Sequence, residues 1–324
     1  MLIFGIETSC DETACSIVKD GREVISNVVA SQIKTHQAFG GVVPEVAARE
    51  HLDAINVVIE ETFATSGIKP SQIDAFASTA GPGLVGCLLV GLNAAKTLSL
   101  VYDRPYIPVN HLNAHVCANF IDTDLKPPFT CLLVSGGHTQ VINVSDYGEC
   151  QIAASTIDDA TGEVYDKVAR LLGLPYPGGI QLDKLAQSGN GHAFKLPEAK
   201  VGDDEFSFSG LKTAVLRLVQ GFKGVEIPIN DVCASFQETI TSTLINKTVK
   251  IAKRNNSTTI VLAGGVAANS RLREKLYALQ DEGFNVFAPK MKYCTDNAAM
   301  VASAAYFNPM KVPNPLELEV FSRG

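Results

Sequence analysis

Two histidines four residues apart, His111 and His115, have the clearest potential for chemistry in this chain. Residues at positions i and i+4 of a helix lie on one face, so the two imidazoles would lie one turn apart. Neutral imidazole nitrogens at that spacing can bind a single transition-metal ion. The same spacing also occurs in histidines that only pack against a neighbouring helix. Because the chain contains only six histidines, the pair favours a metal site.

Asp296, in the segment 294–297, is the carboxylate that could complete a His/His/Asp site. It directly precedes the last expected helix, at about 296–306. The three side chains can meet only if this helix packs back on the first domain, next to the histidine helix. The metal hypothesis therefore predicts a contact between distant parts of the chain.

The pattern of strands and helices that must position these residues occurs twice, at the scale of a domain. A strand, a polar turn and two further strands come first, followed by helices and by another strand that ends in glycines. The expected strands are 2–7, 13–18, 23–30 and 73–78 in the first copy, and 129–134, 140–144, 151–155 and 259–263 in the second. Expected helices include 46–63, 84–101, 162–172, 211–219, 232–254 and 270–279. The repeat predicts two similar α/β domains with a cleft between them.

The two polar turns differ in character. Residues 135–139 are rich in glycine, and backbone N–H groups at such a turn can bind phosphate without lysine; a plain tight turn is the alternative. The first turn, residues 8–12, instead carries Asp11 and Glu12, which would repel phosphate directly. Carboxylates there make sense if a metal ion or water lies between them and the phosphate, or if one of them acts as a base.

Residues 264–269 join a strand to a helix and do not match the GxGxxG pattern, which makes a Rossmann dinucleotide site a weak interpretation. The glycine pair could let a flat base lie over the backbone, with Asn269 supplying hydrogen bonds. A simple strand-to-helix turn remains the alternative.

Carboxylates that could bind ribose hydroxyls lie in two places. Asp183 follows the Pro-Gly-Gly segment 177–179, and Asp166 belongs to an acidic cluster with Asp158, Asp159 and Glu163. Helix capping and solvated charge explain Asp158 and Asp159 better than they explain Asp166.

Two further segments are ambiguous. Residues 206–213 could form a ligand wall, or a buried strand with a serine cap. A positive stripe on the helix 232–254 could contact RNA, although most such stripes are solvated faces; its members are Lys247, Lys250, Lys253 and Arg254.

The bulk composition limits the class of protein. The chain has 324 residues with 46% hydrophobic and 19% charged residues, typical of a well-packed globular protein of about two domains. A net charge of −7 argues against a basic coat for nucleic acid, while a local basic groove or a basic partner stays possible. We expect a cytoplasmic protein without a signal peptide or membrane span, since Asn93 and Lys96 interrupt the apolar run 84–100. The eight cysteines form no CxxC pair, as expected of reduced thiols.

Taken together, the motifs closely resemble the TsaD/Gcp (YgjD) family over nearly the whole chain. They occur in order at residues 5–13, 110–115, 134–139, 176–179, 206–213, 234–237, 264–269 and 294–297. His138, within the second turn, resembles the bacterial or organellar branch. One residue departs from the family pattern, because Ile180 stands where proline usually follows Pro-Gly-Gly.

The resemblance implies an actin-like ATPase (ASKHA) fold, with two similar α/β domains around a nucleotide cleft. The first domain would span 1–109 and be completed by the C-terminal helix at about 295–324; the second would span 110–294. The implied reaction transfers a threonylcarbamoyl group from threonylcarbamoyl-AMP to the exocyclic amine of the adenosine 3′ of the anticodon. The tRNAs would be those that read ANN codons, and the product N6-threonylcarbamoyladenosine.

The resemblance also implies roles for individual residues. His111, His115 and Asp296 would bind one Fe²⁺ or Zn²⁺ ion. The adenine nucleotide, threonylcarbamoyl-AMP or ATP, would contact Leu133, Val134, Ser135, Gly136, Gly137, Asp166, Gly179, Asp183 and Asn269. Asp11 or Glu12 is the candidate for orienting the amine and removing its proton. Implied partners are tRNA, a TsaB-like paralogue and a TsaE-like ATPase.

Three other classes of protein compete with this interpretation. A metalloprotease of the zincin type needs HExxH, and Leu112 stands where its glutamate would be. A small-molecule kinase of the same fold would hold Mg²⁺ with carboxylates and water instead of imidazoles. A non-catalytic nucleotide-binding scaffold is the third, and loss of tRNA modification on mutation of Asp11 would argue against it.

Overall fold

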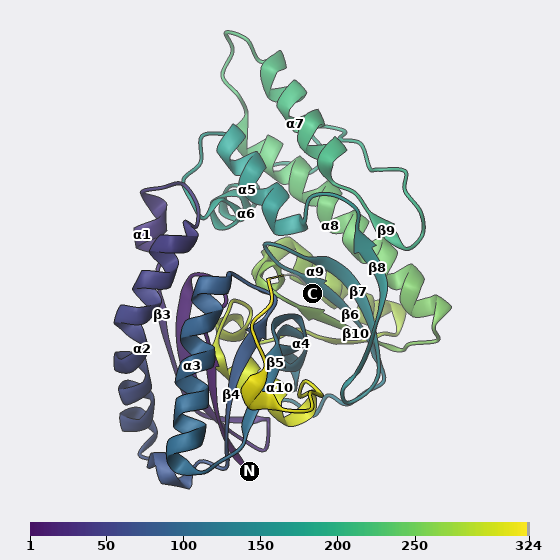
Figure 1. The fold of residues 1–324 in the computed structure, drawn as a ribbon. Coiled ribbons are helices and arrows are strands. Elements are labelled where there is room, and N and C mark those ends of the chain that lie inside the picture. The colour runs from purple at the N-terminus through teal and green to yellow at the C-terminus, as the bar shows by residue number, and fades with distance from the viewer. Residues whose placement is uncertain (323–324) are drawn as a thin grey trace. The chain divides into compact units, whose positions relative to one another are not determined.

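The structure is a computed structural model that describes residues 1–322, which form two compact units, each built on one mixed sheet (Figure 1). The first unit contains residues 1–126, 147–149 and the described chain from 289 onward; the second contains 127–146 and 150–288. The first unit thus extends past the expected boundary at residue 109 and begins its last segment at 289. The reason is that strand β5 (Tyr106–Asn110) runs directly into helix α4 (His111–Cys117), which packs against helix α10 (Ala298–Phe307) of the same unit.

The sheet of the first unit has the strand order β3-β2-β1-β4-β5. Its other strands are β1 (Leu2–Glu7), β2 (Glu12–Lys19), β3 (Glu23–Ser31) and β4 (Ala75–Gly81). Strand β1 pairs antiparallel with β2 and parallel with β4. Residues 3–7 of β1 are all buried, as expected of a central strand with helices on both faces.

Helices cover both faces of this sheet. Helices α2 (Pro44–Ser66) and α3 (Val85–Tyr102) pack side by side on one face, while α10 and α4 pack together on the other side (Figure 1). A short helix, α1 (Ile33–Gln37), precedes α2. Helix α10 lies so close to β1 that a Cβ atom on Gly5 would be 2.6 Å from the Ala298 carbonyl oxygen. This close packing confirms the expectation that the last helix returns to the first domain.

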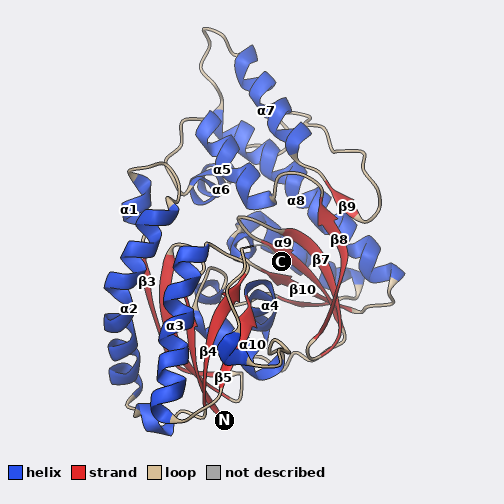
Figure 2. Cartoon of the chain, viewed as in Figure 1, coloured by secondary structure: helices blue, strands red, loops and turns tan. Residues whose placement is uncertain are grey.

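The second sheet, ordered β11-β10-β6-β7-β8-β9, repeats the pattern of the first (Figure 2). Strand β6 pairs antiparallel with β7 and parallel with β10, as β1 does with β2 and β4. The strands are β6 (Phe129–Val134), β7 (Thr139–Asp146), β8 (Glu149–Thr156), β9 (Glu205–Phe206), β10 (Thr259–Ala263) and β11 (Asn285–Phe287). The repeat expected from the sequence is therefore present in the strand order.

The helices of the second unit are α5 (Thr161–Leu171), α6 (Gly178–Ala186), α7 (Ser209–Gly221), α8 (Ile229–Arg254) and α9 (Ser270–Ala278). Helix α8 packs against α6, α9 and β6. Short 3-10 turns lie at Pro70–Gln72, Ala118–Phe120, Gly265–Ala268, Leu279–Glu282, Met291–Tyr293 and Pro315–Glu317. Helix α6 was not expected, because its Pro-Gly-Gly start is typical of a turn.

Helix α3 differs from the buried helix expected at 84–101. It packs its inner face against β4 and β1, but only 33% of its length is buried, and Val101 on the outer face is 67% exposed. Among the described residues α3 alone is long and apolar enough to cross a membrane, a test that the core helices of many globular proteins also pass. The outer face of α3 is therefore an exposed apolar surface of the first unit.

Candidate active site

The histidine pair lies on helix α4, which begins where the sequence supplies a cap. The Asn110 side-chain oxygen accepts hydrogen bonds from the backbone N–H groups of Leu112 (2.9 Å) and Asn113 (3.2 Å). Such a cap satisfies N–H groups that have no partner inside the helix. The helix therefore starts at His111 and places His115 one turn later, with 4.7 Å between the two ring centroids.

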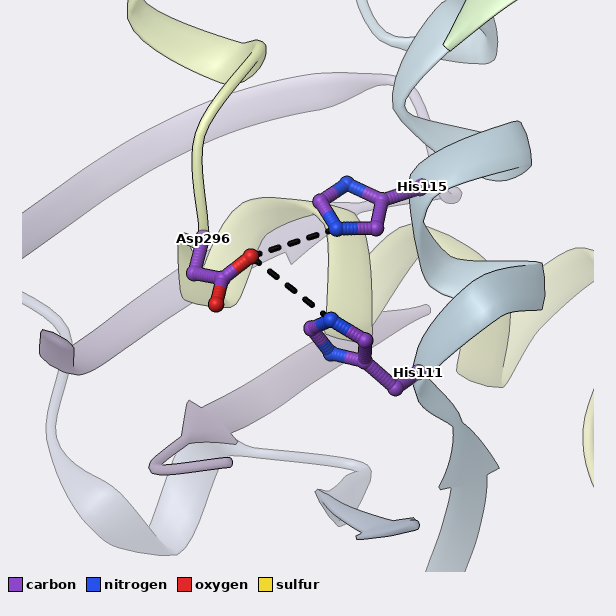
Figure 3. A group of neighbouring side chains, drawn as sticks. All are labelled: His111, His115 and Asp296. Atoms are coloured by element: carbon purple, nitrogen blue, oxygen red, sulfur yellow. Dashed lines mark ion pairs between the residues drawn. The ribbon is translucent and has the colours of Figure 1, made fainter. Parts of the chain in front are cut away.

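Asp296 reaches both histidines from the segment before α10 (Figure 3). One of its oxygens, Oδ1, lies 3.2 Å from Nε2 of His115 and 3.7 Å from Nε2 of His111. The next residue, Asn297, fixes this segment by accepting a hydrogen bond from the Met300 N–H at the start of α10. The structure thus brings the three predicted metal ligands together within the first unit.

The donor set of this cluster fits a metal ion. His115 is 1% exposed; its Nε2 faces Asp296 Oδ1 at 3.2 Å, while its Nδ1 has no hydrogen-bond partner among residues 1–322. A buried polar atom without a partner costs about 1–3 kcal/mol, which coordination would offset. One ligand atom from each of His111, His115 and Asp296 lies within 4.8 Å of the others. Two imidazoles and one carboxylate suit Zn²⁺ or Fe²⁺ better than Mg²⁺.

Glu7 is a functional residue that the sequence reasoning missed. Its side chain is fully buried at the end of β1, where Oε2 accepts a hydrogen bond from Thr79 Oγ1 (2.6 Å) and lies 3.3 Å from His111 Nδ1. Its other oxygen, Oε1, accepts from the Ser9 backbone N–H. A carboxylate at Nδ1 keeps the proton on that nitrogen and leaves Nε2 of His111 to face Asp296.

The charges around His111 change its protonation. Burial alone would lower the pKa of His111, but the nearby carboxylates of Asp296 and Glu7 outweigh it and raise the pKa to about 9. In the metal-free protein His111 is therefore protonated at neutral pH. Binding a metal ion at this ring must then release a proton.

The turn between β1 and β2, residues 8–11, brings the predicted acid pair near the same cluster. Burial, followed by the charges of Asp296 and Asp11, raises the pKa of Glu12 to about 10. Glu12 thus carries a proton at neutral pH in the metal-free protein and is no base in that state. Asp11 is 9% exposed, and its carboxylate, like that of Asp296, lies close enough to Glu12 to act on it. The role of Asp11 or Glu12 in orienting the amine and removing its proton stays a prediction.

In the second unit, the predicted phosphate loop is open. The turn after β6 is closed by hydrogen bonds from Ser135 N to the His138 carbonyl (2.8 Å) and from His138 N to Ser135 Oγ (3.1 Å). A Cβ atom on Gly136 or Gly137 would have no neighbour within 4 Å. Packing does not require glycine at these two positions, so the open space is available to a ligand. Leu133 and Val134, by contrast, are buried within β6.

Two of the predicted nucleotide residues contact each other directly. Asp183 Oδ1 accepts hydrogen bonds from Asn269 Nδ2 (3.2 Å), Gln237 Nε2 (2.9 Å) and Ser270 Oγ (2.8 Å). Asn269 also caps α9 through its side-chain oxygen. Asn269 therefore uses its amide to organise Asp183, and contact with an adenine base stays a prediction.

Asp166 and Gly179 form a second predicted pair. Asp166 Oδ1 accepts a hydrogen bond from the Gly179 backbone N–H (3.1 Å), in the first turn of α6. A Cβ atom on Gly178 would lie 3.1 Å from the same oxygen, so α6 starts in close contact with α5. Ile180, which stands where the family usually has proline, is the third residue of α6 and its side chain is 63% exposed. The contact between Asp166 and the Gly179 N–H is therefore formed without that proline.

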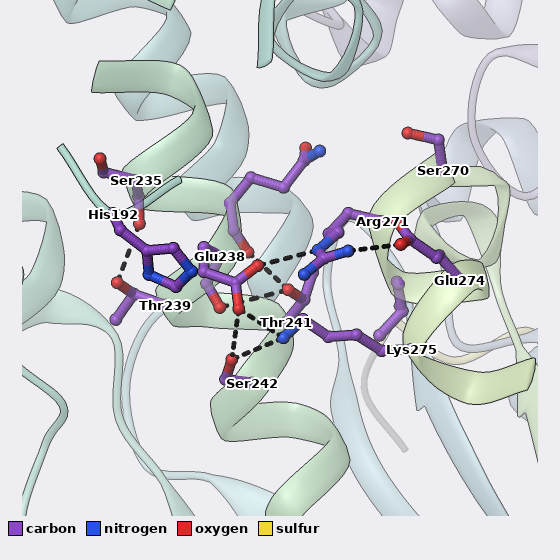
Figure 4. A network of polar contacts seen from close by, with 12 residues as sticks. His192, Ser235, Glu238, Thr239, Thr241, Ser242, Ser270, Arg271, Glu274 and Lys275 are labelled. Atoms are coloured by element: carbon purple, nitrogen blue, oxygen red, sulfur yellow. Dashed lines mark hydrogen bonds and ion pairs between the residues drawn. The ribbon is translucent and has the colours of Figure 1, made fainter. Parts of the chain in front are cut away.

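A pocket of about 320 Å³ adjoins the Asp183 network, since Gln237 and Ser270 contribute to both. Glu238 lies on its wall and pairs with Arg271 (2.8 Å) and Lys275 (2.6 Å), as Figure 4 shows. Burial would raise the pKa of Glu238, but these two cations lower it to about 2. The pocket thus has a fixed anionic group whose charge is balanced by its neighbours.

The remaining sequence motifs have structural roles. Asp158 accepts hydrogen bonds from Ser207 Oγ (2.6 Å) and the Phe208 N–H (2.8 Å) before α7, and Asp159 pairs with Lys167 and Lys212. Asp158 therefore binds the chain that leads into α7 and does not cap the neighbouring helix α5, whose N-cap residue Ala160 makes no side-chain cap. The positive stripe on α8 is neutralised within its own unit: Lys250, Lys253 and Arg254 pair with Asp203, Glu282 and Asp204, and Lys247 donates to backbone carbonyls.

Comparison with known proteins identifies relatives over almost the whole chain. Residues 23–303 match a family model described as TsaD, tRNA N6-adenosine threonylcarbamoyltransferase. Curated proteins of that name include one from Clostridium perfringens (strain SM101 / Type A), 52% identical, with 96% of this chain and 93% of the relative aligned. Another, from Gloeothece citriformis (strain PCC 7424), is 52% identical and covers 99% of this chain and 96% of the relative.

Solved structures identify the fold. Component A of the (R)-2-hydroxyglutaryl-CoA dehydratase of Acidaminococcus fermentans aligns with a TM-score of 0.55 at 18% identity, covering 94% of this chain and 98% of that chain. HypF of T. kodakarensis aligns with a TM-score of 0.66 at 15% identity, covering 94% and 47%. These similarities, together with the two mixed sheets, establish the expected actin-like ATPase fold.

Proposed function

The chain belongs to the TsaD family of tRNA N6-adenosine threonylcarbamoyltransferases, and we propose that its two side-chain clusters divide the transfer between them. It is a transferase that forms N6-threonylcarbamoyladenosine in tRNA. In our proposal the cluster of the first unit activates the acyl group and the cluster of the second unit binds the nucleotide. The observation that carries the proposal is the convergence of His111, His115 and Asp296, three residues that the family resemblance selects as metal ligands.

The three ligands would hold one Fe²⁺ or Zn²⁺ ion. When bound, such an ion supplies Lewis-acid stabilisation for charge that develops on an oxygen of the donor. The protein's own residues prepare the site: Glu7 orients His111, and the cap at Asn110 fixes the helix that carries both histidines. Because these groups are held by the fold before any ligand binds, little reorganisation is needed during the reaction.

The donor, threonylcarbamoyl-AMP, would bind in the second unit. The backbone N–H groups of Gly136 and Gly137 would receive its phosphate, because those of Ser135 and His138 donate within the turn and the open space at the two glycines allows close approach. Asp166 and Asp183 would accept hydrogen bonds from the ribose hydroxyls. The adjoining pocket of about 320 Å³ has room for the adenine base, and Gln237 on its wall accepts a hydrogen bond from Asn269 Nδ2 at 2.9 Å.

Asp11 and Glu12 would orient the amine of the acceptor adenosine and take up its proton. AMP is a good leaving group, so positioning and proton removal are the tasks left to side chains. Glu12 carries a proton in the metal-free protein, so it would accept the amine proton only in a state in which its own proton has left. The acceptor lies in a single-stranded loop of tRNA, where a base is accessible without opening a duplex.

A paralogous TsaB-like partner would dock on the exposed face of α3. Its outer residues carry no charge over the helix length, and Val85, Leu89 and Leu100 are 46%, 42% and 66% exposed. Exposed apolar surface of this extent is typical of a protein–protein interface. A TsaE-like ATPase is the second expected partner. Leu89→Asp should abolish binding of the paralogue, while Val225→Asp, at a 69% exposed valine in the second unit, should leave it intact.

Transfer of ¹⁴C-threonine label to tRNA tests the central proposal. The mixture contains this protein, its partner proteins and a source of threonylcarbamoyl-AMP, and the metal content of each variant is measured in parallel. Asp296→Asn should lose both metal and label. The matched control is Asp122→Asn, a surface carboxylate that pairs with Lys290 at 2.7 Å and should keep both. Full label on metal-free Asp296→Asn would overturn the metal-assisted mechanism.

A further inference from the structure

His51, in the middle of α2, is a buried histidine that the proposed mechanism does not use. It is 0% exposed and contacts one residue of the turn between β1 and β2, Cys10, and one residue of β2, Thr13. Its Nδ1 lies 2.7 Å from Thr13 Oγ1, and its Nε2 lies 2.9 Å from the Cys10 carbonyl oxygen. Asp11 and Glu12 lie between these two contacts in the sequence.

The two partners determine the tautomer of this ring. A carbonyl oxygen only accepts, so Nε2 of His51 must carry the proton that it donates to Cys10. The neutral ring then has a lone pair on Nδ1, which accepts the hydroxyl proton of Thr13. Burial lowers the pKa of His51, and the neutral ring is the form that this arrangement requires. The hydrogen bonds are therefore directional and specific to one tautomer.

The backbone of the turn is held at three consecutive carbonyls. Ser9 O accepts from the Leu84 N–H (2.8 Å), and Asp11 O accepts from the Gln32 N–H (2.9 Å). Only the carbonyl between them, that of Cys10, is held by a side chain, the imidazole of His51. Loss of this contact would free the peptide that immediately precedes Asp11, whereas the flanking backbone contacts would keep the turn folded.

We propose that His51 is a positioning residue for the transfer reaction: it fixes the peptide between Cys10 and Asp11 so that the acid pair is aimed at the metal cluster. The inference rests on the proposed role of Asp11 and Glu12. A displacement of about 1 Å in a reacting group can cost about 100-fold in rate. Removing the His51 contacts should therefore reduce kcat while leaving the metal ligands and the nucleotide site in place.

Steady-state tRNA modification by the complete system, with its partner proteins, tests this inference. His51→Leu should lower kcat by about 10- to 100-fold, with KM for the donor and bound metal within twofold of wild type. His51→Gln, whose side-chain amide can donate to Cys10 in place of Nε2, should recover at least part of kcat. The matched control is Thr62→Val, also buried on α2, whose hydroxyl contacts Val58 and Cys15 instead of the turn. It should keep kcat within twofold.

Three results would overturn the inference. One is a fall in kcat for His51→Leu no larger than that for Thr62→Val; another is a change confined to KM. The third is an ¹⁵N spectrum of wild-type protein with the proton of His51 on Nδ1. A double-mutant cycle separates this inference from the proposed function. If Asp11→Asn alone keeps full activity, the role of that carboxylate in the proposed function fails; if its effect adds independently to that of His51→Leu, the positioning role fails.

Discussion

The turns after β1 and after β6 occupy equivalent places in the two sheets, yet their surroundings are opposite. Each follows a central strand that pairs antiparallel with the next strand and parallel with a strand far along the chain. The first turn is filled: Thr8 and Ser9 are buried, and backbone N–H groups and the His51 side chain hold its carbonyls. In the second turn, the side-chain positions of Gly136 and Gly137 face open space, with no atom within 4 Å of an added Cβ.

The contrast indicates how one architecture serves two kinds of chemistry. Burial and the charges of Asp296 and Asp11 raise the pKa of Glu12, and the carboxylates of Asp296 and Glu7 outweigh burial and raise the pKa of His111. These shifts are the reason why we propose proton and metal chemistry near the first turn. An open glycine turn offers backbone N–H groups of fixed direction, which suits an anion. The proposed metal ligands come from other elements, α4 and the segment before α10, and Nδ1 of His111 contacts Glu7 at the end of β1 and Ser9 in the first turn.

The largest expected effect is on metal affinity when the Glu7 carboxylate that contacts His111 is removed. Glu7→Gln should weaken metal binding by about 10- to 100-fold, because loss of the carboxylate at Nδ1 removes the group that orients His111. Isothermal titration with Zn²⁺ and with anaerobic Fe²⁺ measures the change. Ser26→Ala, a buried hydroxyl elsewhere in the same sheet, serves as the control. Unchanged affinity in Glu7→Gln would remove Glu7 from the metal site.

A pH titration sharpens the comparison next. Because the folded pKa of His111 is raised from 6.5 to about 9, metal must displace a proton below that pH. Affinity should therefore rise about tenfold per pH unit between 7 and 8 and level off above about 9. The stability of the metal-free protein should change in the opposite direction: the contribution of His111 is fully present below about pH 6.5 and is lost as pH rises through about 9. Metal affinity that is flat with pH would contradict a protonated His111. Thermal unfolding of the metal-free protein over the same pH range measures the predicted change in stability.

Much of this site could be predicted from local sequence. The spacing of His111 and His115 in a capped helix, and the glycines of the second turn, are short-range sequence patterns. Their interpretation does not depend on contacts with distant parts of the chain. The domain repeat was equally visible, since it depends on the order of strands and turns. Helix α6 was missed because Pro-Gly-Gly usually ends a helix, whereas here Asp166 accepts from the first turn and stabilises its start.

Glu7 and His51 could not be found in the same way. A carboxylate at the end of an apolar strand has the same sequence pattern whether it is buried or solvated. The partners of Glu7 that decide its role lie 72 and 104 residues away, and those of His51 lie 38 and 41 residues away. Such roles depend on three-dimensional contacts that a single sequence does not display. The exposed outer face of α3 was missed for a related reason, because a continuous apolar run does not show which side of a helix is covered.

A pair of glycine substitutions tests the filled turn against the open one. Gly136→Ala should leave stability within about 1 kcal/mol of wild type, since its Cβ meets no atom within 4 Å, while AMP affinity falls by about tenfold. Gly83→Ala should instead destabilise the protein by about 1–3 kcal/mol, because its Cβ would lie 2.8 Å from the Ser9 carbonyl oxygen. Chemical denaturation and AMP titration of both variants measure these effects. The comparison fails if Gly136→Ala unfolds more easily than Gly83→Ala.

The smallest effect is expected at Ile180, where this chain departs from its family. Ile180 lies in the first turn of α6, whose N–H groups have no intrahelical acceptor, so a proline there removes no bond of the helix. Its side chain is 63% exposed and contributes little packing. Ile180→Pro should therefore change stability by less than about 1 kcal/mol and AMP affinity by less than twofold, with Ile180→Ala as the control for loss of the side chain. A loss of AMP affinity in Ile180→Pro but not in Ile180→Ala would mean that the backbone at residue 180 controls the position of the Gly179 N–H, which donates to Asp166. The nucleotide-binding cluster of the second unit would then be less rigid than its hydrogen bonds indicate.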